Sequence, residues 1–172
     1  MTRMYLRQHR AFTLIELLII VMILGILAML TVPNFTSAAG QARENSLKTT
    51  LKNFRTQIQF YNAHHNLYPG YPSGSASTPD ATTFSRQLTM FSDGTGAVSA
   101  TKTASATFGP YVEAMPANPI NNLSTVLVVT GVNQSTVHDP DGTTGWIYEA
   151  DTGRVYANVT SSDSAGHLYV TY

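Results

Sequence analysis

Three stretches with different hydrophobic patterns follow one another along the first 66 residues. Residues 1–11 carry three arginines and no acid, residues 12–32 form an almost unbroken apolar run, and residues 34–66 are amphipathic. At about 1.5 Å per residue, a helix over the apolar run would be about 31 Å long, which is enough to cross the hydrocarbon core of a bilayer. The pattern therefore predicts a membrane-spanning helix.

The amphipathic stretch continues this helix. Its large apolar residues recur at spacings of four, three, four and three, which is typical of one buried helix face. They are Leu47, Leu51, Phe54, Ile58 and Tyr61. Together the two stretches predict one helix of roughly fifty residues, ending near Asn66 and far longer than a usual globular helix. Its apolar half needs lipid or copies of itself as neighbours.

Beyond residue 66 the pattern breaks into turns and short elements. A second short helix is expected after Thr78 as its N-cap, with Pro79 in the first turn. Its apolar face would comprise Phe84, Leu88 and Phe91. Residues 93–107 are expected to form a loop.

Segments rich in β-branched and aromatic residues then predict strands at 126–130, 145–150 and 154–159, with a further one at 168–171. Short links favour antiparallel pairing. The segment 150–153 is expected to form a hairpin turn with a positive φ at Gly153. Trp146, Tyr148 and Val155 are expected to face the long helix.

Composition and charge narrow the function. The chain has 172 residues, 43% of them hydrophobic, with ten basic and ten acidic side chains and no cysteine. A net charge of zero provides no field that attracts nucleic acid, so we expect no nucleic-acid partner. Disulfides and cysteine metal sites are excluded.

Charge is distributed unevenly at the N-terminus. Arg3, Arg7 and Arg10 precede the apolar run, which indicates a cytoplasmic N-terminus and an exported remainder. Glu16 lies inside the run, where a carboxylate at the bilayer centre costs about 2.5 to 3.5 kcal/mol. Cleavage before Phe12 would create an α-amino group that could neutralise Glu16 of a neighbouring copy. That pairing would be an assembly device.

These residues resemble the prepilin cleavage and methylation signature of type IV pilin-like proteins. The signature is a short Arg-rich leader, Ala11, and then Phe12-Thr13-Leu14-Ile15-Glu16 with a long apolar helix. The resemblance implies that prepilin peptidase cuts between Ala11 and Phe12 and methylates Phe12, and that Glu16 guides assembly. The family usually has Gly where this chain has Ala11. Pro33 stands where many members carry a helix-breaking proline, and it marks a point where the helix could kink.

The resemblance implies an α+β, type IV pilin-like fold, in which the long N-terminal helix packs on a small C-terminal antiparallel sheet. Residues 1–11 would be the leader, 12–33 the transmembrane and polymerisation segment, 34–66 the amphipathic spine and 67–172 the globular region. Tyr-Pro after the helix and the segment from Gly109-Pro110-Tyr111 to Pro119 resemble the major, G-type pseudopilins of type II secretion.

The implied function is that of a pseudopilus subunit in the inner membrane, with its C-terminal region in the periplasm. It would polymerise as a homo-oligomer and drive protein export across the outer membrane. The implied partners are prepilin peptidase, the inner-membrane platform with its assembly ATPase, and minor pseudopilins. A type IV pilus fibre for adhesion, motility or DNA uptake, or a minor tip subunit that binds a ligand, stays open.

Two other interpretations of the N-terminus stay open at this point. A secretory signal peptide would place its cleavage site at Ser37-Ala38-Ala39, but an acid at the start of its apolar region is unexpected. A plain membrane anchor explains the hydrophobicity, but not the combination of Phe12 and Glu16.

Other candidate sites are weaker. Asp151-Thr152-Gly153 resembles an aspartic protease motif but occurs once, whereas that chemistry needs two carboxylates. His64 and His65 are adjacent and point apart on a helix, which disfavours metal binding. Asp139 and Asp141 are calcium candidates because G-type pseudopilins hold calcium in a C-terminal loop, although a simple turn explains them too. We expect no enzyme and no required cofactor.

Overall fold

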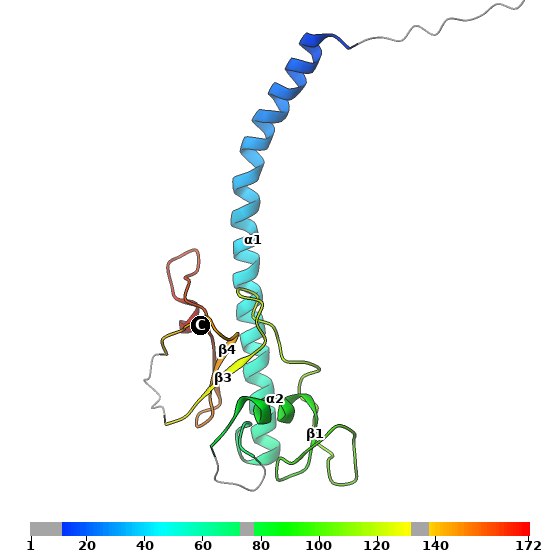
Figure 1. Ribbon diagram of the computed structural model, residues 1–172, viewed down its shortest axis with the longest axis vertical. Coiled ribbons are helices and arrows are strands. Elements are labelled where there is room, and N and C mark those ends of the chain that lie inside the picture. The colour runs from blue at the N-terminus through cyan, green and yellow to red at the C-terminus, as the bar shows by residue number, and fades with distance from the viewer. Residues whose placement is uncertain (1–11, 73–77, 132–137) are drawn as a thin grey trace, which may run out of the picture. The chain divides into compact units, whose positions relative to one another are not determined.

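The computed structural model describes residues 12–72, 78–131 and 138–172, without the side chains of residues 30–37. The chain divides into two compact units, Met1–Gly40 and Gln41–Tyr172, called here the N-terminal and C-terminal units. Helix α1, Leu14–His65, belongs to both (Figure 1). Its 52 residues agree with the predicted length.

The C-terminal unit adds one helix and two small sheets to the second half of α1 (Figure 1). A three-stranded sheet has the order β3-β4-β5, and a two-stranded sheet pairs β1 with β2. The elements are α2 (Ala81–Thr89), β1 (Phe91–Ser92), β2 (Val98–Ser99), β3 (Val126–Val129), β4 (Trp146–Glu149), β5 (Arg154–Ala157) and the 3₁₀ helix η1 (Tyr169–Thr171). A long helix with a small sheet confirms the predicted α+β, pilin-like fold. β2 lies in the predicted loop 93–107. Phe91 was predicted on the apolar face of the short helix, which is wrong because α2 ends at Thr89 and Phe91 belongs to β1.

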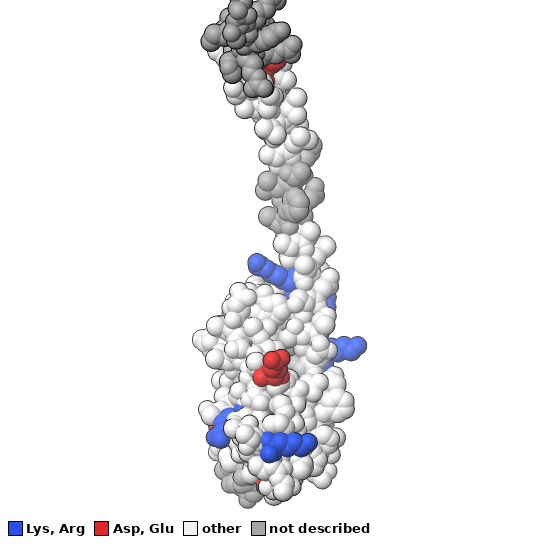
Figure 2. Space-filling view, turned by 90° about the vertical axis from the view of Figure 1, so that its right-hand side faces the viewer, with Lys and Arg blue, Asp and Glu red and all other residues white. Residues whose placement is uncertain are grey.

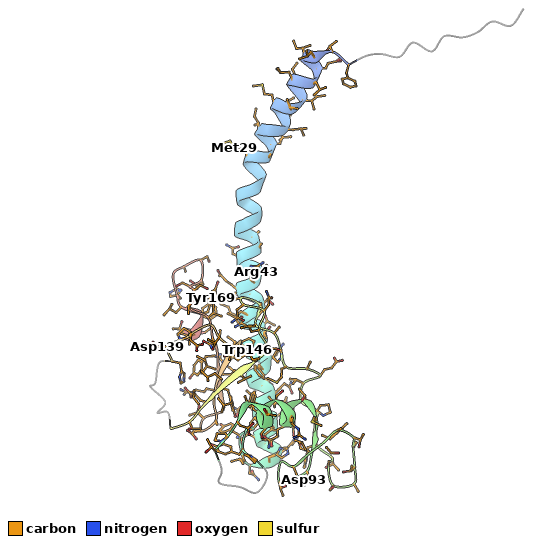
Figure 3. All side chains as sticks on the ribbon, viewed as in Figure 1. Met29, Arg43, Asp93, Asp139, Trp146 and Tyr169 are labelled. Atoms are coloured by element: carbon orange, nitrogen blue, oxygen red, sulfur yellow. The ribbon has the colours of Figure 1, made fainter. Side chains whose placement is uncertain are left out.

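The core forms between the apolar stripe of α1 and one face of the larger sheet. All five residues of the predicted stripe are at most 2% exposed. Phe54 is central, because its ring lies 5.7 Å from the Trp146 ring and 6.0 Å from the Phe84 ring, both edge to face. Trp146, Tyr148 and Val155 are fully buried in this core, as predicted. Figure 3 shows the position of Trp146 between the sheet and α1.

The end of α1 and the start of α2 each have a local structural cause. α1 stops at His65, and Asn66 follows with φ of 53°, a conformation that ends helices. The N-cap of α2 is Asp80, whose Oδ1 accepts the N–H groups of Thr82 and Thr83. The predicted cap at Thr78 is therefore wrong by two residues, since the Asp80 carboxylate is the group that satisfies the free N–H groups.

The predicted antiparallel sheet is partly wrong. β4 and β5 are antiparallel around a turn in which Gly153 has φ of 70°, as predicted. β3 and β4, however, run parallel, with Val126 opposite Trp146. Parallel neighbours need a crossover of about a dozen residues or more, and the segment 130–145 is long enough to supply it. The sheet is therefore mixed.

The expected fourth strand at 168–171 is also wrong, because Tyr169–Thr171 forms the 3₁₀ helix η1. The outer edge of β5 is occupied by a side chain of α1 instead. Arg55 donates from Nε and Nη2 to the Val155 carbonyl, at 3.1 and 2.8 Å, and from Nη2 to the Tyr172 carbonyl. The edge carbonyl is thus satisfied without a further strand.

Candidate functional site

The first turn of α1 is closed by Thr13 and Glu16. The Thr13 backbone N–H and hydroxyl donate to Glu16 Oε2, at 3.0 and 2.9 Å, and the Glu16 backbone N–H donates to Thr13 Oγ1 at 3.3 Å. This reciprocal arrangement is a capping box. Thr13 was missed as a partner of Glu16, although its position three residues before a glutamate is the signal that predicts such a cap.

The described side chains of the N-terminal unit are exposed. The large apolar residues between Phe12 and Met29 are 46–86% exposed, with Phe12 at 73%. Glu16 is the only charged residue between positions 12 and 40. In Figure 2 the described atoms of this unit are accordingly almost all white. So large an apolar surface is typical of a segment that contacts lipid or protein.

Three further predictions concern this unit. Among the residues that the structure describes, no helix is both long and apolar enough to cross a membrane. Ala11 lies outside the described residues. α1 continues through position 33, so Pro33 does not end it. The cleavage site, the assembly role of Glu16 and a kink of the helix at Pro33 stay predictions.

The calcium candidates lie on the loop before β4. The carboxylate of Asp141 already accepts three hydrogen bonds at Oδ1, from the Thr143 N–H at 2.9 Å, the Thr143 hydroxyl at 2.8 Å and Asn158 Nδ2 at 2.7 Å. These bonds, chiefly that from the Thr143 amide, lower the pKa of Asp141. Donor groups aimed at this oxygen do not fit a cation at the same place.

Asp139, the second calcium candidate, is not part of a metal-binding group among the described residues either. Asp139 is exposed and lies away from Asp93, another loop carboxylate (Figure 3). Within the described ranges, no group of three or more His, Cys, Asp or Glu residues is arranged to hold a metal. The bond from the Thr143 N–H to Asp141 Oδ1 and the φ of 71° at Gly142 indicate a local Asx turn here.

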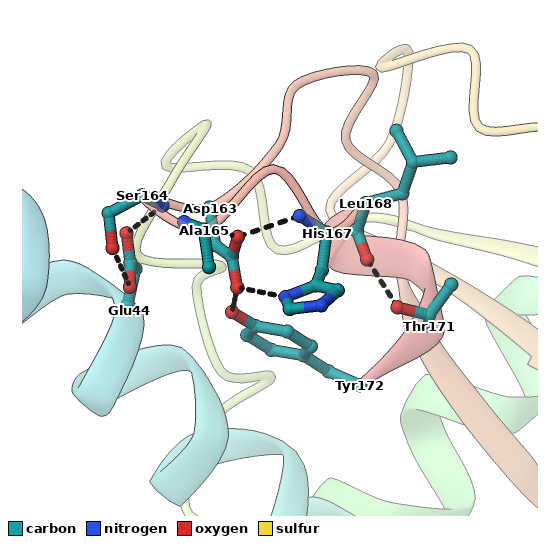
Figure 4. Close-up of polar contacts among 8 residues, drawn as sticks. All are labelled: Glu44, Asp163, Ser164, Ala165, His167, Leu168, Thr171 and Tyr172. Carbon is teal, nitrogen blue, oxygen red and sulfur yellow. Dashed lines mark hydrogen bonds and ion pairs between the residues drawn. The ribbon is translucent and has the colours of Figure 1, made fainter.

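A second carboxylate organises the C-terminal loop (Figure 4). Asp163 Oδ1 accepts the N–H groups of Ala165 and His167, at 2.8 and 2.7 Å. Its Oδ2 accepts the Tyr172 hydroxyl and contacts His167 Nδ1 at 3.3 Å. The bond from Tyr172 is the main cause that lowers the pKa of Asp163, whereas burial and this bond raise the pKa of Tyr172.

The same loop is attached to α1. Ser164 donates from its backbone N–H to Glu44 Oε1 at 2.8 Å and from its hydroxyl to Glu44 Oε2 at 3.2 Å. Lys48 Nζ lies 4.6 Å from the centre of the Tyr172 ring. Sequence reasoning missed this network because its partners are up to 120 positions apart.

The histidine pair at the end of α1 is structural. His64 Nδ1 lies 2.8 Å from the Tyr111 hydroxyl. His65 bridges the Tyr61 carbonyl and the Ser92 hydroxyl, at 2.9 and 3.0 Å, which joins α1 to β1. This agrees with the expected polar pair at a helix end. The Asp151-Thr152-Gly153 segment forms the β4–β5 turn, as predicted.

The N-terminal segment is similar to that of known proteins. The model of the prokaryotic N-terminal methylation motif matches residues 6–32. The chain is 38% identical over 68 residues to type II secretion system core protein G of Pseudomonas aeruginosa, covering 40% of this chain and 48% of that protein. The N-terminal segment thus carries the prepilin methylation motif and is similar to that of type IV pilins and of core protein G.

Other pilin-like relatives match a similar part of the chain. Identity is 33% over 73 residues to type IV major pilin protein PilA of Myxococcus xanthus, covering 42% of this chain and 33% of that protein. It is 33% over 85 residues to type IV wide pilus major component PilA4 of Thermus thermophilus, covering 46% and 65%. The chain thus spans between a third and two thirds of the length of these relatives. No solved structure matches it significantly.

The pilin-like family consists of structural subunits and not of enzymes, which agrees with the expectation from the sequence. The similarity of the N-terminal segment indicates a pilin-like structural subunit.

Proposed function

We propose that the chain is a subunit of a type II secretion pseudopilus, which polymerises through its N-terminal helix and drives protein export across the outer membrane. The names of relatives such as core protein G of Pseudomonas aeruginosa and Aeromonas hydrophila support this choice. So does the Gly109-Pro110-Tyr111 segment, which resembles the G-type pattern.

One observation carries the proposal: the apolar side chains from Phe12 to Met29 are exposed, and Glu16 is the only charge among them. Before assembly, lipid covers residues 12–33 as a single-pass membrane helix, with the N-terminus in the cytoplasm and residues 67–172 in the periplasm. In the filament, outside the inner membrane, copies of the same helix cover one another. Residues 34–66 form the spine that joins the two parts.

Glu16 has a specific role in this assembly. Prepilin peptidase cuts between Ala11 and Phe12 and methylates the new amino group of Phe12. In the single chain, Thr13 occupies Oε2 of Glu16. The amino group of a neighbouring subunit approaches Oε1, so that the capping box holds the carboxylate in place while the second oxygen receives the cation. In a low-dielectric bundle such a pair fixes the axial stagger of the copies.

The proposed partners follow from this role. They are prepilin peptidase, the inner-membrane secretion platform, its assembly ATPase and the minor pseudopilins, besides the copies of the chain itself.

The experiment compares Glu16→Gln with Glu113→Gln in cells that express the assembly system. Glu113 is an exposed acid of the C-terminal unit, so its variant removes one charge elsewhere. We expect Glu16→Gln to remain in the membrane fraction but to form no filaments by electron microscopy, and to stop export. Glu113→Gln should behave as wild type. Normal filaments from Glu16→Gln would refute the role of Glu16.

A type IV pilus fibre is the second candidate, because pilins of Myxococcus xanthus and Thermus thermophilus match the same segment. Long surface fibres, with protein export unchanged when the gene is deleted, would favour that function. A minor tip subunit would instead be present in only a few copies per filament, which quantitative mass spectrometry measures.

A further inference from the structure

The larger sheet has one edge that the rest of the described chain leaves unpaired. The Trp146 N–H donates to the Thr125 carbonyl, and the Ala150 N–H donates to the Val129 carbonyl. With Val126 opposite Trp146 in a parallel pair, these bonds fix which β3 residues face β4. Leu127 and Val129 point their backbone groups toward β4, and Val126 and Val128 point theirs outward.

These outward groups lack partners within the described residues. Neither backbone nor side-chain groups there form hydrogen bonds with the outward N–H and C=O groups of Val126 and Val128. The opposite edge of the sheet differs, because Arg55 satisfies the Val155 carbonyl of β5. Among the described residues, the β5 edge of this small sheet is therefore satisfied by a side chain, whereas the β3 edge is unpaired.

The open edge also lacks the charged residues and prolines that discourage pairing at many edge strands. Natural edge strands are blunted by charges, Pro or bulges. The segment 124–130 reads Ser-Thr-Val-Leu-Val-Val-Thr and contains neither a charge nor a proline. Leu127, in its middle, is 40% exposed. Such a segment is suited to receive another extended strand.

A groove begins at the same edge. It has a volume of about 440 Å³ and lies between α2 and the start of β3. Its lining combines apolar side chains and hydroxyl groups with one cation, Arg86. The Arg86 side chain is exposed, and none of the described residues forms a hydrogen bond or ion pair with its guanidinium. A carboxylate is the group that complements it.

We propose that the outer edge of β3 and this groove bind an extended polypeptide segment of a partner protein, which adds a strand beside Val126 and Val128 and places an acidic side chain against Arg86. Main-chain hydrogen bonds supply the general affinity, and the Arg86 contact supplies the preference for an acidic residue.

The test uses the full chain in detergent micelles and a fluorescein-labelled seven-residue peptide of alternating Thr and Val with one Glu. Its controls are the same peptide with Gln for Glu and one with a central Pro. Anisotropy should show binding of the Glu peptide, about five-fold weaker binding of the Gln peptide and none of the Pro peptide. Amide exchange by NMR should slow at Val126 and Val128 and stay unchanged at Leu127, whose N–H is already paired with β4.

Two variants separate the parts of the site. Val128→Pro removes one outward N–H without removing a bond to β4, and should weaken the Glu peptide about five-fold. Arg86→Gln should abolish the preference for Glu over Gln, whereas Lys52→Gln, on exposed α1 surface, should retain it. Circular dichroism confirms that each variant is folded.

Three results would overturn the proposal. They are equal binding of the Pro peptide, unchanged amide exchange at Val126 and Val128 with bound peptide, and a dimer of the chain that Val128→Pro dissociates. The last result would show that the edge pairs with a second copy instead.

Discussion

Thr13 and Glu16 hold each other at the start of α1, through two hydrogen bonds to the carboxylate and one back to the threonine hydroxyl. Glu16, for which we propose a role in assembly, is thus also part of a helix cap. A capping box favours the negative charge, because the first turn of a helix carries free N–H groups. The cap therefore holds the Glu16 side chain in a defined position in the single chain.

The first prediction concerns this cap. Thr13→Ala should destabilise the first turn by about 1 kcal/mol, since it removes the side chain of an N-cap. Amide exchange of residues 14–17 in micelles should become faster, and Thr13→Ser, which keeps the hydroxyl, should behave as wild type. Equal exchange rates in Thr13→Ala and wild type would contradict the capping role.

The second prediction concerns the core of the C-terminal unit. Phe54 is 2% exposed, and Phe60, on the same helix, is 52% exposed. Phe54→Ala should lower the free energy of unfolding by about 3 to 5 kcal/mol, and Phe60→Ala by less than about 0.5 kcal/mol. Urea unfolding followed by Trp146 fluorescence measures both. Similar losses in the two variants would contradict the packing described for α1.

The third prediction concerns the pH dependence of the C-terminal loop. Hydrogen bonds, chiefly from Tyr172, lower the pKa of Asp163. A lowered pKa means that the contribution to stability is complete above the unfolded value of about 3.9 and is lost as the pH falls through the folded value. Asp163→Asn and Tyr172→Phe should therefore lower the melting temperature at pH 7.

As the pH falls below about 4, the difference between wild type and the two variants should shrink progressively, because protonation of Asp163 weakens the same bonds. Melting curves between pH 2 and 7 test this. A difference from wild type that stays constant over the whole range would show that the carboxylate does not provide the stabilisation.

The fourth prediction concerns calcium. Since hydrogen-bond donors already surround Asp141 Oδ1, adding calcium or a chelator should leave the melting temperature unchanged. Asp141→Asn should lower the melting temperature equally with and without calcium. A rise on adding calcium that Asp139→Asn and Asp141→Asn abolish would show instead that the loop rearranges to bind the ion.

Features that depend on nearby residues could be predicted from the sequence. The spacing of Leu47, Phe54 and Tyr61 identified the buried face of α1, because a helix fixes which positions share a side. Gly153 identified the β4–β5 turn for a similar local reason. The N-terminal motif required only residues 1–33.

Features that join distant segments could not be predicted. The parallel pairing of β3 with β4 depends on the path of the chain between the two strands. The hydrophobic pattern does not determine this path. Arg55 reaches Val155 and Tyr172 across 100 and 117 positions, and this contact replaces the strand expected at 168–171. The unpaired outer edge of β3 likewise could not be predicted, because it depends on the register of β3 against β4.

The most direct test of the account is the mass of the protein extracted from the membrane fraction of cells with their own prepilin peptidase. We predict a chain that begins at Phe12 and carries one methyl group on its amino terminus. A chain with residues 1–11 intact, or one cut near residue 39, would contradict processing before Phe12 and with it the proposed pairing of Glu16 with a neighbouring amino group.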